Sequence, residues 1–142
     1  MIDQITVYLE NKQGRLAALC RTLGDAGINM HALTIADTTD YGVARIICDD
    51  PARAVKILDD DDWRASITKV AAVEVPNEPG GLAGMLDSIA GSGVNVEYSY
   101  CFATPSRQAV FVMKVHGGNE VLDSLTKAGY KALQPSDLYA DH

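Results

Sequence analysis

Two segments of the chain alternate apolar and polar residues, and each is followed by apolar residues at helical spacing. The alternation over Ile5–Leu9, repeated more loosely over Ala71–Val75, predicts a strand in each case. A turn with glycine comes next, and Gly27 and Gly93 stand where a left-handed residue would end the helix that follows. The two helical stripes are Leu16, Leu19, Cys20 and Leu23 in the first, and Leu82, Met85, Leu86 and Ile89 in the second.

The rest of each half repeats one order of elements. Two β-rich runs follow each helix, joined by turn-rich connections at 37–42 and 104–107, and then come a second helix and a short β segment. The runs are Met30–Ala36 and Val43–Cys48, then Val96–Ala103 and Ala109–Val115; the second helices are Pro51–Leu58 and Asn119–Ala128; the short segments are Ser66–Val70 and Lys131–Leu133. The order β-α-β-β-α-β, present twice, predicts an α+β protein of two ferredoxin-like units, each an antiparallel four-stranded sheet with helices on one face.

An internal repeat supports this division. A shift of 66 residues places Asn11-Lys12-Gln13-Gly14-Arg15-Leu16-Ala17 on Asn77-Glu78-Pro79-Gly80-Gly81-Leu82-Ala83, and Gly27-Ile28-Asn29-Met30 on Gly93-Val94-Asn95-Val96 without a gap. Two matching blocks at one spacing are improbable by chance. We therefore expect two domains, residues 1–69 and 70–142, packed together because no Pro/Gly/Ser linker separates them.

Composition narrows the class of protein. The 142 residues, 47% of them apolar, suit one ordinary or two very small globular domains. No apolar run approaches the roughly 20 residues of a membrane span, and no signal-peptide pattern follows Met1. The three dispersed cysteines, Cys20, Cys48 and Cys101, are expected to be small core residues of a cytoplasmic protein.

The charge of the chain argues against two classes of partner. The net charge is −7, and the basic residues are scattered singly. Binding to nucleic acid or to an anionic membrane depends on neutralising negative groups, so we expect neither partner.

The two helix starts suggest a site for a small charged molecule. Gly14 in the first copy, and Gly80 with Gly81 in the second, remove side chains where backbone N–H groups point outward. A carboxylate would also meet the positive end of the helix dipole there. Asparagine offers donors and an acceptor together, which suits a zwitterion.

The four repeated asparagines also have a purely structural interpretation. Asn11 and Asn77 can be helix N-caps, and Asn29 and Asn95 can satisfy backbone groups after the helix ends. The residues alone leave both interpretations open.

At these positions the sequence resembles the ACT domain family. The resemblance rests on Asn-x-Pro-Gly-x-Leu after a first strand and Gly-[Ile/Val]-Asn-[Ile/Val] after the first helix, and its tandem form covers nearly the whole chain. It implies a β-α-β-β-α-β fold and the binding of an amino acid at a domain interface, by the loop after the first strand and the start of the second. Gln13 departs from the pattern where proline is usual, and Leu9 and Val75 replace a contact that is polar in some members.

The resemblance assigns Asn11 and Asn29 to one site, and Asn77 and Asn95 to the other. Beside them we expect ligand contacts from the loop and helix start of each copy, and His31 as a further candidate; the added residues are Gly14, Arg15 and Leu16, then Gly80, Gly81 and Leu82. Pro79 preorganises the second loop, and Gly80 and Gly81 leave its backbone open, so we expect both sites to take one ligand and the second to bind it more tightly.

Three other features have simpler interpretations than a site. Asp59–Asp62 is expected to be a solvated helix end, since consecutive carboxylates cannot converge on one metal ion. Tyr98 and Tyr100 should share one packed sheet face. Cys101 should be a core thiol without catalytic activation.

Three functions fit these observations. The first is a regulatory protein without cofactor, metal or catalysis, which binds an L-amino acid and modulates a partner enzyme or its own assembly. The second is a structural oligomerisation module, and the third a small ferredoxin-like enzyme. Open sheet edges lead us to expect a homodimer.

Overall fold

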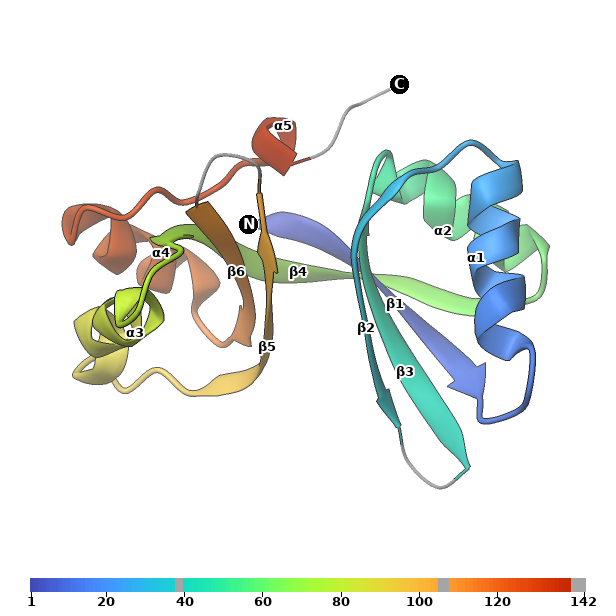
Figure 1. Cartoon of the computed structure of the whole chain (residues 1–142), viewed down its shortest axis with the longest axis horizontal. Helices are drawn as coiled ribbons and strands as arrows, with labels where there is room; N and C mark the ends of the chain where they lie inside the picture. The colour runs from blue at the N-terminus through green and yellow to red at the C-terminus, as the bar shows by residue number, and fades with distance from the viewer. Residues whose placement is uncertain (38–39, 105–107, 139–142) are drawn as a thin grey trace. The chain divides into compact units, whose positions relative to one another are not determined.

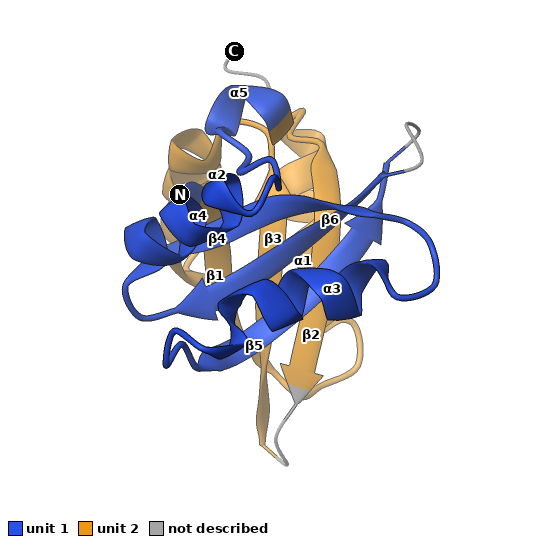
Figure 2. Ribbon diagram, turned by 90° about the vertical axis from the view of Figure 1, so that its left-hand side faces the viewer, with its two compact units in different colours: residues 1–2, 69–137 blue, residues 3–68, 138–142 orange. Residues whose placement is uncertain are grey.

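The computed structural model describes residues 1–37, 40–104 and 108–138, so parts of the turn-rich connections 37–42 and 104–107 lie outside the described residues. The chain divides into two compact units (Figure 2). We call residues 3–68, with the chain end from 138, the N-terminal unit (orange), and residues 1–2 and 69–137 the C-terminal unit (blue).

The N-terminal unit has the predicted order of elements, with its sheet ordered β2-β3-β1-β4. The helices α1 and α2 both cover one face of this sheet (Figure 1). The elements are β1 (Ile2–Glu10), α1 (Arg15–Asp25), β2 (Met30–Asp37), β3 (Tyr41–Cys48), α2 (Pro51–Asp60) and the start of β4 (Arg64–Pro76).

The C-terminal unit repeats the order, with strands β4-β6-β5 side by side. Its elements are the rest of β4, α3 (Gly81–Ala90), β5 (Val96–Ala103), β6 (Gln108–Val115), α4 (Gly118–Lys127) and a short α5 (Pro135–Leu138). The fourth strand of this unit is reduced to a bridge between Val73 and Ala132. The predicted fold class, an α+β protein of two ferredoxin-like units, is thereby confirmed.

Two details differ from the prediction. The segments Ser66–Val70 and Ala71–Val75 form one 13-residue strand, β4, because no glycine or proline interrupts them. The short helix α5 was not predicted; it begins at Pro135, a residue suited to a first turn.

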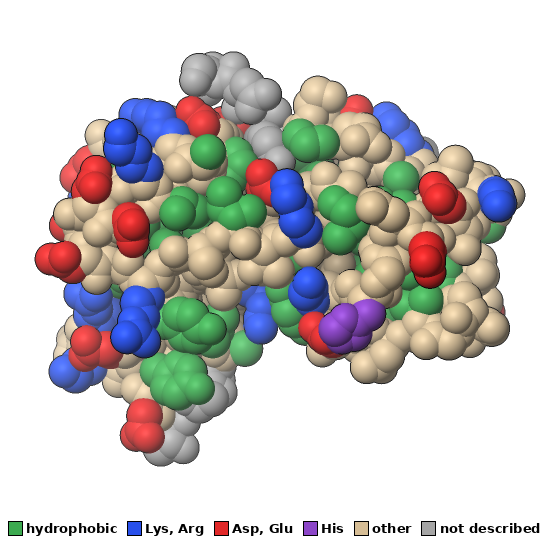
Figure 3. Space-filling view, turned by 180° about the vertical axis from the view of Figure 1, so that it is seen from behind, with side chains coloured by type: hydrophobic (Ala, Val, Ile, Leu, Met, Phe, Trp, Pro, Cys, Tyr) green, Lys and Arg blue, Asp and Glu red, His purple; other side chains and the backbone are tan. Residues whose placement is uncertain are grey.

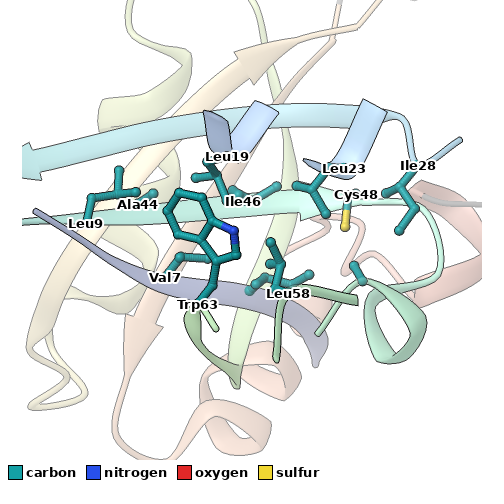
Figure 4. Packing of buried hydrophobic residues seen from close by; sticks show 12 residues of the cluster. Val7, Leu9, Leu19, Leu23, Ile28, Ala44, Ile46, Cys48, Leu58 and Trp63 are labelled. Atoms are coloured by element: carbon teal, nitrogen blue, oxygen red, sulfur yellow. The ribbon is translucent and has the colours of Figure 1, made fainter. Parts of the chain in front are cut away.

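Each unit has its own apolar core. In the N-terminal unit the buried side chains come from β1, β3, α1 and α2, and two more come from connections: Ile28, between α1 and β2, and Trp63, between α2 and β4 (Figure 4). Of the predicted stripe on α1, Leu19 and Leu23 are buried, whereas Leu16 is 41% exposed. Leu16 lies in the first turn of α1, where it lines a cavity described below.

The cysteines differ from one another in burial. Cys48 lies in the core, and burial raises the pKa of its thiol to about 12. The prediction that Cys101 is a core residue is wrong, because its side chain is exposed, whereas the raised pKa of its thiol agrees with the predicted lack of activation. Cys101 lies on the edge strand β5, where Glu97, Ser99 and Ala103 on the same face are exposed too, while Tyr98 and Tyr100 alternate with them and are half-buried, as expected.

Alkylation should separate these thiols. Because only a solvent-accessible thiolate reacts, we expect iodoacetamide to modify Cys101 in the native protein and to spare Cys48 until the chain unfolds. Mass spectrometry of timed samples measures this, with a denatured sample in which all three cysteines react as control. Equal rates for Cys48 and Cys101 in the native protein would contradict the assignment.

The surface carries charges of both signs. On the face seen in Figure 3, lysine and arginine side chains are interspersed with aspartate and glutamate. Among the residues that the structure describes, no helix is long and apolar enough to cross a membrane.

Candidate functional site

The two helix starts share one backbone design. Gly14 (φ 86°) and Gly80 (φ 83°) are the N-caps of α1 and α3, both left-handed, and neither helix has a side-chain cap. The N-cap interpretation of Asn11 and Asn77 is therefore wrong, because the turn requires a positive φ at the cap and only glycine adopts it freely. Both asparagines lie three residues earlier, in the loop.

The loop itself uses the first N–H of each helix. Arg15 N donates to Lys12 O (3.3 Å), and Gly81 N donates to Glu78 O (3.0 Å). An anion at these helix starts would therefore meet the following N–H groups, those of Leu16 and Leu82.

A cavity of about 200 Å³ opens beside the first helix start. Three of the predicted ligand residues, Asn11, Arg15 and Leu16, line it together with Ile35 of β2 and Gly42 of β3. Drug-sized ligands need about 300 to 1,000 Å³, so this space suits a smaller molecule.

Asn29 and His31 lie at the other end of α1. This helix has 11 residues, or about 16 Å at 1.5 Å per residue, so one amino acid cannot reach from Asn11 to Asn29 along it. The structure thus does not bring the two asparagines of the first copy together within the N-terminal unit. Asn29 precedes β2 and accepts a backbone hydrogen bond from Asp49 N (3.0 Å).

The second copy is arranged in the same way. Asn77, Gly80, Gly81 and Leu82 lie at the start of α3, and Asn95 lies beyond its end. Asn95 lines a separate cavity of about 430 Å³.

Three of the four repeated asparagines have side chains that are available to a ligand. Asn29, Asn77 and Asn95 are exposed. Within the described ranges, their amide groups make no hydrogen bond to the protein. The interpretation that Asn29 and Asn95 serve neighbouring backbone groups therefore has no support in the contacts.

A histidine–carboxylate pair lies at equivalent positions of the two copies, but the histidine and the carboxylate have exchanged places. His31 Nε2 lies 2.7 Å from Asp49 Oδ1, and Glu97 Oε1 lies 2.7 Å from His116 Nε2. A histidine beside a carboxylate, purple against red, is visible in Figure 3. His31 and Glu97 each lie at a β-bulge. The bulge interrupts the strand alternation that was expected to put His31 on the same face as Asn29.

The acidic run is the exposed end of α2, as expected. Asp61 Oδ2 accepts hydrogen bonds from Trp63 Nε1 (3.0 Å) and Thr22 Oγ1 (3.0 Å). In the described part of the chain, no group of three or more His, Cys, Asp or Glu side chains has the arrangement of a metal site.

The N-terminal unit also holds a larger cavity, which the sequence did not predict. It measures about 610 Å³ and lies where β1 ends, α1 begins and β4 begins. Of its lining residues only Arg15 was a candidate; Trp63 and Arg64 were not. The signal in the sequence was weak: the single tryptophan of the chain stands next to an arginine.

Comparison with known proteins identifies relatives of this fold. The family model described as an ACT domain pair matches residues 1–132. The crystal structure of protein BT0572 from Bacteroides thetaiotaomicron is 36% identical, with a TM-score of 0.91, and the match covers 96% of this chain and 94% of that one. No curated protein matches the chain.

More distant structures share the fold. The ligand-free regulatory subunit of aspartate kinase from Thermus thermophilus is 17% identical (TM-score 0.66), with 89% of this chain and 91% of that one covered. The corresponding subunit from Thermus flavus is 19% identical (TM-score 0.60), with 89% and 92% covered.

Proposed function

The chain belongs to the ACT domain pair family, and from this premise we propose that it is a regulatory protein that binds an L-amino acid. In this proposal it modulates a partner enzyme or its own assembly and catalyses no reaction. Structures with the same fold include regulatory subunits of aspartate kinase, which makes a metabolic enzyme the class of partner to test. The three free thiols fit a cytoplasmic protein.

The cavity at the start of α1 carries the proposal. It collects an amide, a guanidinium and an apolar side chain, from Asn11, Arg15 and Leu16, in a space for a small molecule. A ligand carboxylate would bind the helix start and Arg15, since both favour negative charge. The amide of Asn11 can accept from the ligand ammonium, and Leu16 offers apolar contact.

The second copy supplies an analogous loop at Asn77, and we keep the proposal that Asn29 and Asn95 belong to ligand sites. Asn11 and Asn29 lie at opposite ends of α1, and Asn77 and Asn95 at opposite ends of α3. The two members of a pair would therefore contact one ligand only if the site lies at an interface between domains. The more rigid loop with Pro79 is still expected to bind more tightly.

Thermal melting against the twenty amino acids tests the proposal. A ligand at about 100 times its Kd should stabilise the protein by roughly 2.7 kcal/mol, which is readily visible as a raised Tm. D-amino acids at the same concentration serve as controls. An unchanged Tm with all twenty would leave the structural oligomerisation module as the better interpretation.

Calorimetric titration of Asn11→Ala, Asn29→Ala, Asn77→Ala and Asn95→Ala locates the sites. Each loss of a buried hydrogen bond to the ligand should weaken binding by about 1 to 3 kcal/mol. Four variants that bind like the parent would remove these residues from the sites. Losses confined to Asn11→Ala and Asn29→Ala would reverse the expected order of affinities.

We also propose a homodimer. The edge strand β2 carries Leu33 and Ile35, which are 39% and 40% exposed, and an open apolar edge favours pairing with another strand. Light scattering should give twice the chain mass at micromolar concentration. Ile35→Lys should shift the mass toward the monomer, whereas Ile67→Lys on β4, which also changes an exposed isoleucine, should not. A monomer with and without ligand would refute the dimer.

A further inference from the structure

The 610 Å³ cavity of the N-terminal unit has an unusual set of side chains for a surface hollow. Two arginines, Arg15 and Arg64, line it together with three aromatic residues, Tyr8, Tyr41 and Trp63. Its volume lies in the range that small organic ligands occupy, about 300 to 1,000 Å³. It shares one wall, which includes Arg15, with the smaller cavity beside Asn11.

Arg15 is held in place by stacking. The centre of its guanidinium lies 4.2 Å from the centroid of the Trp63 ring, and Trp63 is itself 5% exposed. Stacking occupies a face of the guanidinium and leaves the in-plane N–H groups free to bind a carboxylate through two parallel hydrogen bonds. The Nε of Arg15 is fully buried, and among the described residues it has no hydrogen-bond partner. Because Nε is inaccessible, a carboxylate in the cavity would bind the terminal N–H groups of Arg15.

Arg64 adds a second positive charge. Neither Arg64 nor Arg15 forms an ion pair or hydrogen bond through its side chain to any described residue. Of the carboxylates in the lining, Glu10 is bound by Lys12 at 2.8 Å, and this contact holds the pKa of Glu10 below its usual range. The charge of Arg15 also lowers the pKa of Glu10, and Asp62 is the other carboxylate of the lining. Two guanidinium groups without an ion-pair partner among the described residues leave donors for an anion, although the net charge of the chain is −7.

The tyrosines offer an apolar surface next to the arginines. The rings of Tyr8 and Tyr41 lie 6.3 Å apart between centroids, tilted by 54°. They are 50% and 47% exposed. Aromatic pairs of this geometry accept a further ring by edge or face contact, which favours a ligand with an aromatic body.

The C-terminal copy shows that the fold does not require these residues. Trp63 N donates to Leu58 O and Tyr130 N donates to Leu125 O, so Tyr130 occupies the position of Trp63. Gly129 and Asp62, one residue earlier, are both at positive φ, and Gly81 stands where Arg15 does. The arginine, the tryptophan and a non-glycine residue in a left-handed conformation thus occur together only in the N-terminal copy, a pattern that indicates a site rather than a folding requirement.

We propose that this cavity binds an aromatic carboxylate. Its carboxylate would pair with Arg15 and Arg64, and its ring would contact Tyr8 and Tyr41. The ligand could be an aromatic α-amino acid or an aromatic acid without an ammonium group. The carboxylate of Asp62 can accept a hydrogen bond from the ammonium group, which only the amino acid has, and would thereby distinguish the two. The proposal does not depend on the amino-acid site at Asn11.

Tryptophan fluorescence provides a direct readout, because Trp63 is the only tryptophan of the chain. We expect phenylacetate and L-phenylalanine to change the fluorescence saturably, and the tighter of the two identifies the source of the ligand. Acetate, which lacks the ring, and phenethylamine, which lacks the carboxylate, should bind at least about tenfold more weakly.

Variants of Arg64 distinguish binding in the cavity from a nonspecific change in fluorescence. Arg64→Gln should raise the Kd about tenfold or more, Arg64→Lys should have a smaller effect, and Arg21→Gln, an exposed arginine of α1 outside the cavity, should have none. Asn11→Ala should keep the fluorescence response even where it abolishes stabilisation by an amino acid, which separates this proposal from the proposed function. The proposal fails if neither aromatic probe gives saturation. It also fails if Arg64→Gln binds as tightly as the parent and the control Arg21→Gln.

Discussion

Replacing Gly81 with alanine is expected to destabilise the protein by about 3 kcal/mol, at the upper end of what overpacking usually costs. A Cβ at this position would lie 2.2 Å from the carbonyl oxygen of Pro76. That oxygen belongs to the backbone of β4, so relief would require the start of α3 to move away from the strand. Urea denaturation followed by far-UV circular dichroism measures the change.

Gly118→Ala is the matched control. Gly118 is also the first residue of a helix that follows a left-handed glycine N-cap. Its added Cβ would lie 2.5 Å from Met1 Cε, the far end of a flexible side chain that can turn away. We expect a loss below about 1 kcal/mol for this variant. Equal losses for Gly81→Ala and Gly118→Ala would mean that the approach to Pro76 is not what requires glycine at position 81.

The close approach of Gly81 to Pro76 could not be predicted from the sequence. The repeat located both helix starts, because Gly14 and Gly80 mark them in register, but it assigned Gly81 only to an open backbone for a ligand. The close approach of Pro76 depends on how α3 leaves β4 in three dimensions, which no local pattern encodes. The same limit applies to Asn11 and Asn77: a residue type suited to capping does not become a cap when the turn places glycine there.

The fold was easier to predict from the sequence than the candidate site. Alternation and helical spacing identify the elements because each element must bury one face, and both copies follow the same pattern. The edges were harder to predict. Cys101 has apolar neighbours in sequence, yet β5 is an edge strand, so one of its faces stays exposed. The bulge at His31 shifts the alternation by a residue, which cannot be read from the apolar pattern alone.

The two cavities of the N-terminal unit illustrate the same point for function. Asn11, Arg15 and Leu16 are close in sequence, so their repeat made them visible as candidates. The larger cavity joins residues more than fifty positions apart, such as Tyr8 and Trp63, and becomes visible only when β1 and the start of β4 lie together. Because Arg15 lines both cavities, a ligand that reorients its guanidinium in one would alter the other.

Trp63→Ala is expected to destabilise the protein by about 3 to 5 kcal/mol, since it removes the largest side chain of the N-terminal core and leaves a void. Trp63→Phe should lose about 1 to 2 kcal/mol, because it keeps a ring in the core but removes the hydrogen bond from Nε1 to Asp61. Urea denaturation followed by circular dichroism measures both, since neither variant retains tryptophan fluorescence.

The phenylalanine variant also separates packing from support of the site. A phenyl ring still offers a face to Arg15, although a cation binds indole more strongly. Calorimetric titration of Trp63→Phe with phenylacetate should therefore show weakened but measurable binding in a folded protein. Trp63→Leu, which fills much of the core without a ring, should bind more weakly still. If Trp63→Leu binds like Trp63→Phe at similar stability, stacking on Trp63 does not orient Arg15, and the position of the guanidinium must be fixed by the backbone of α1 alone.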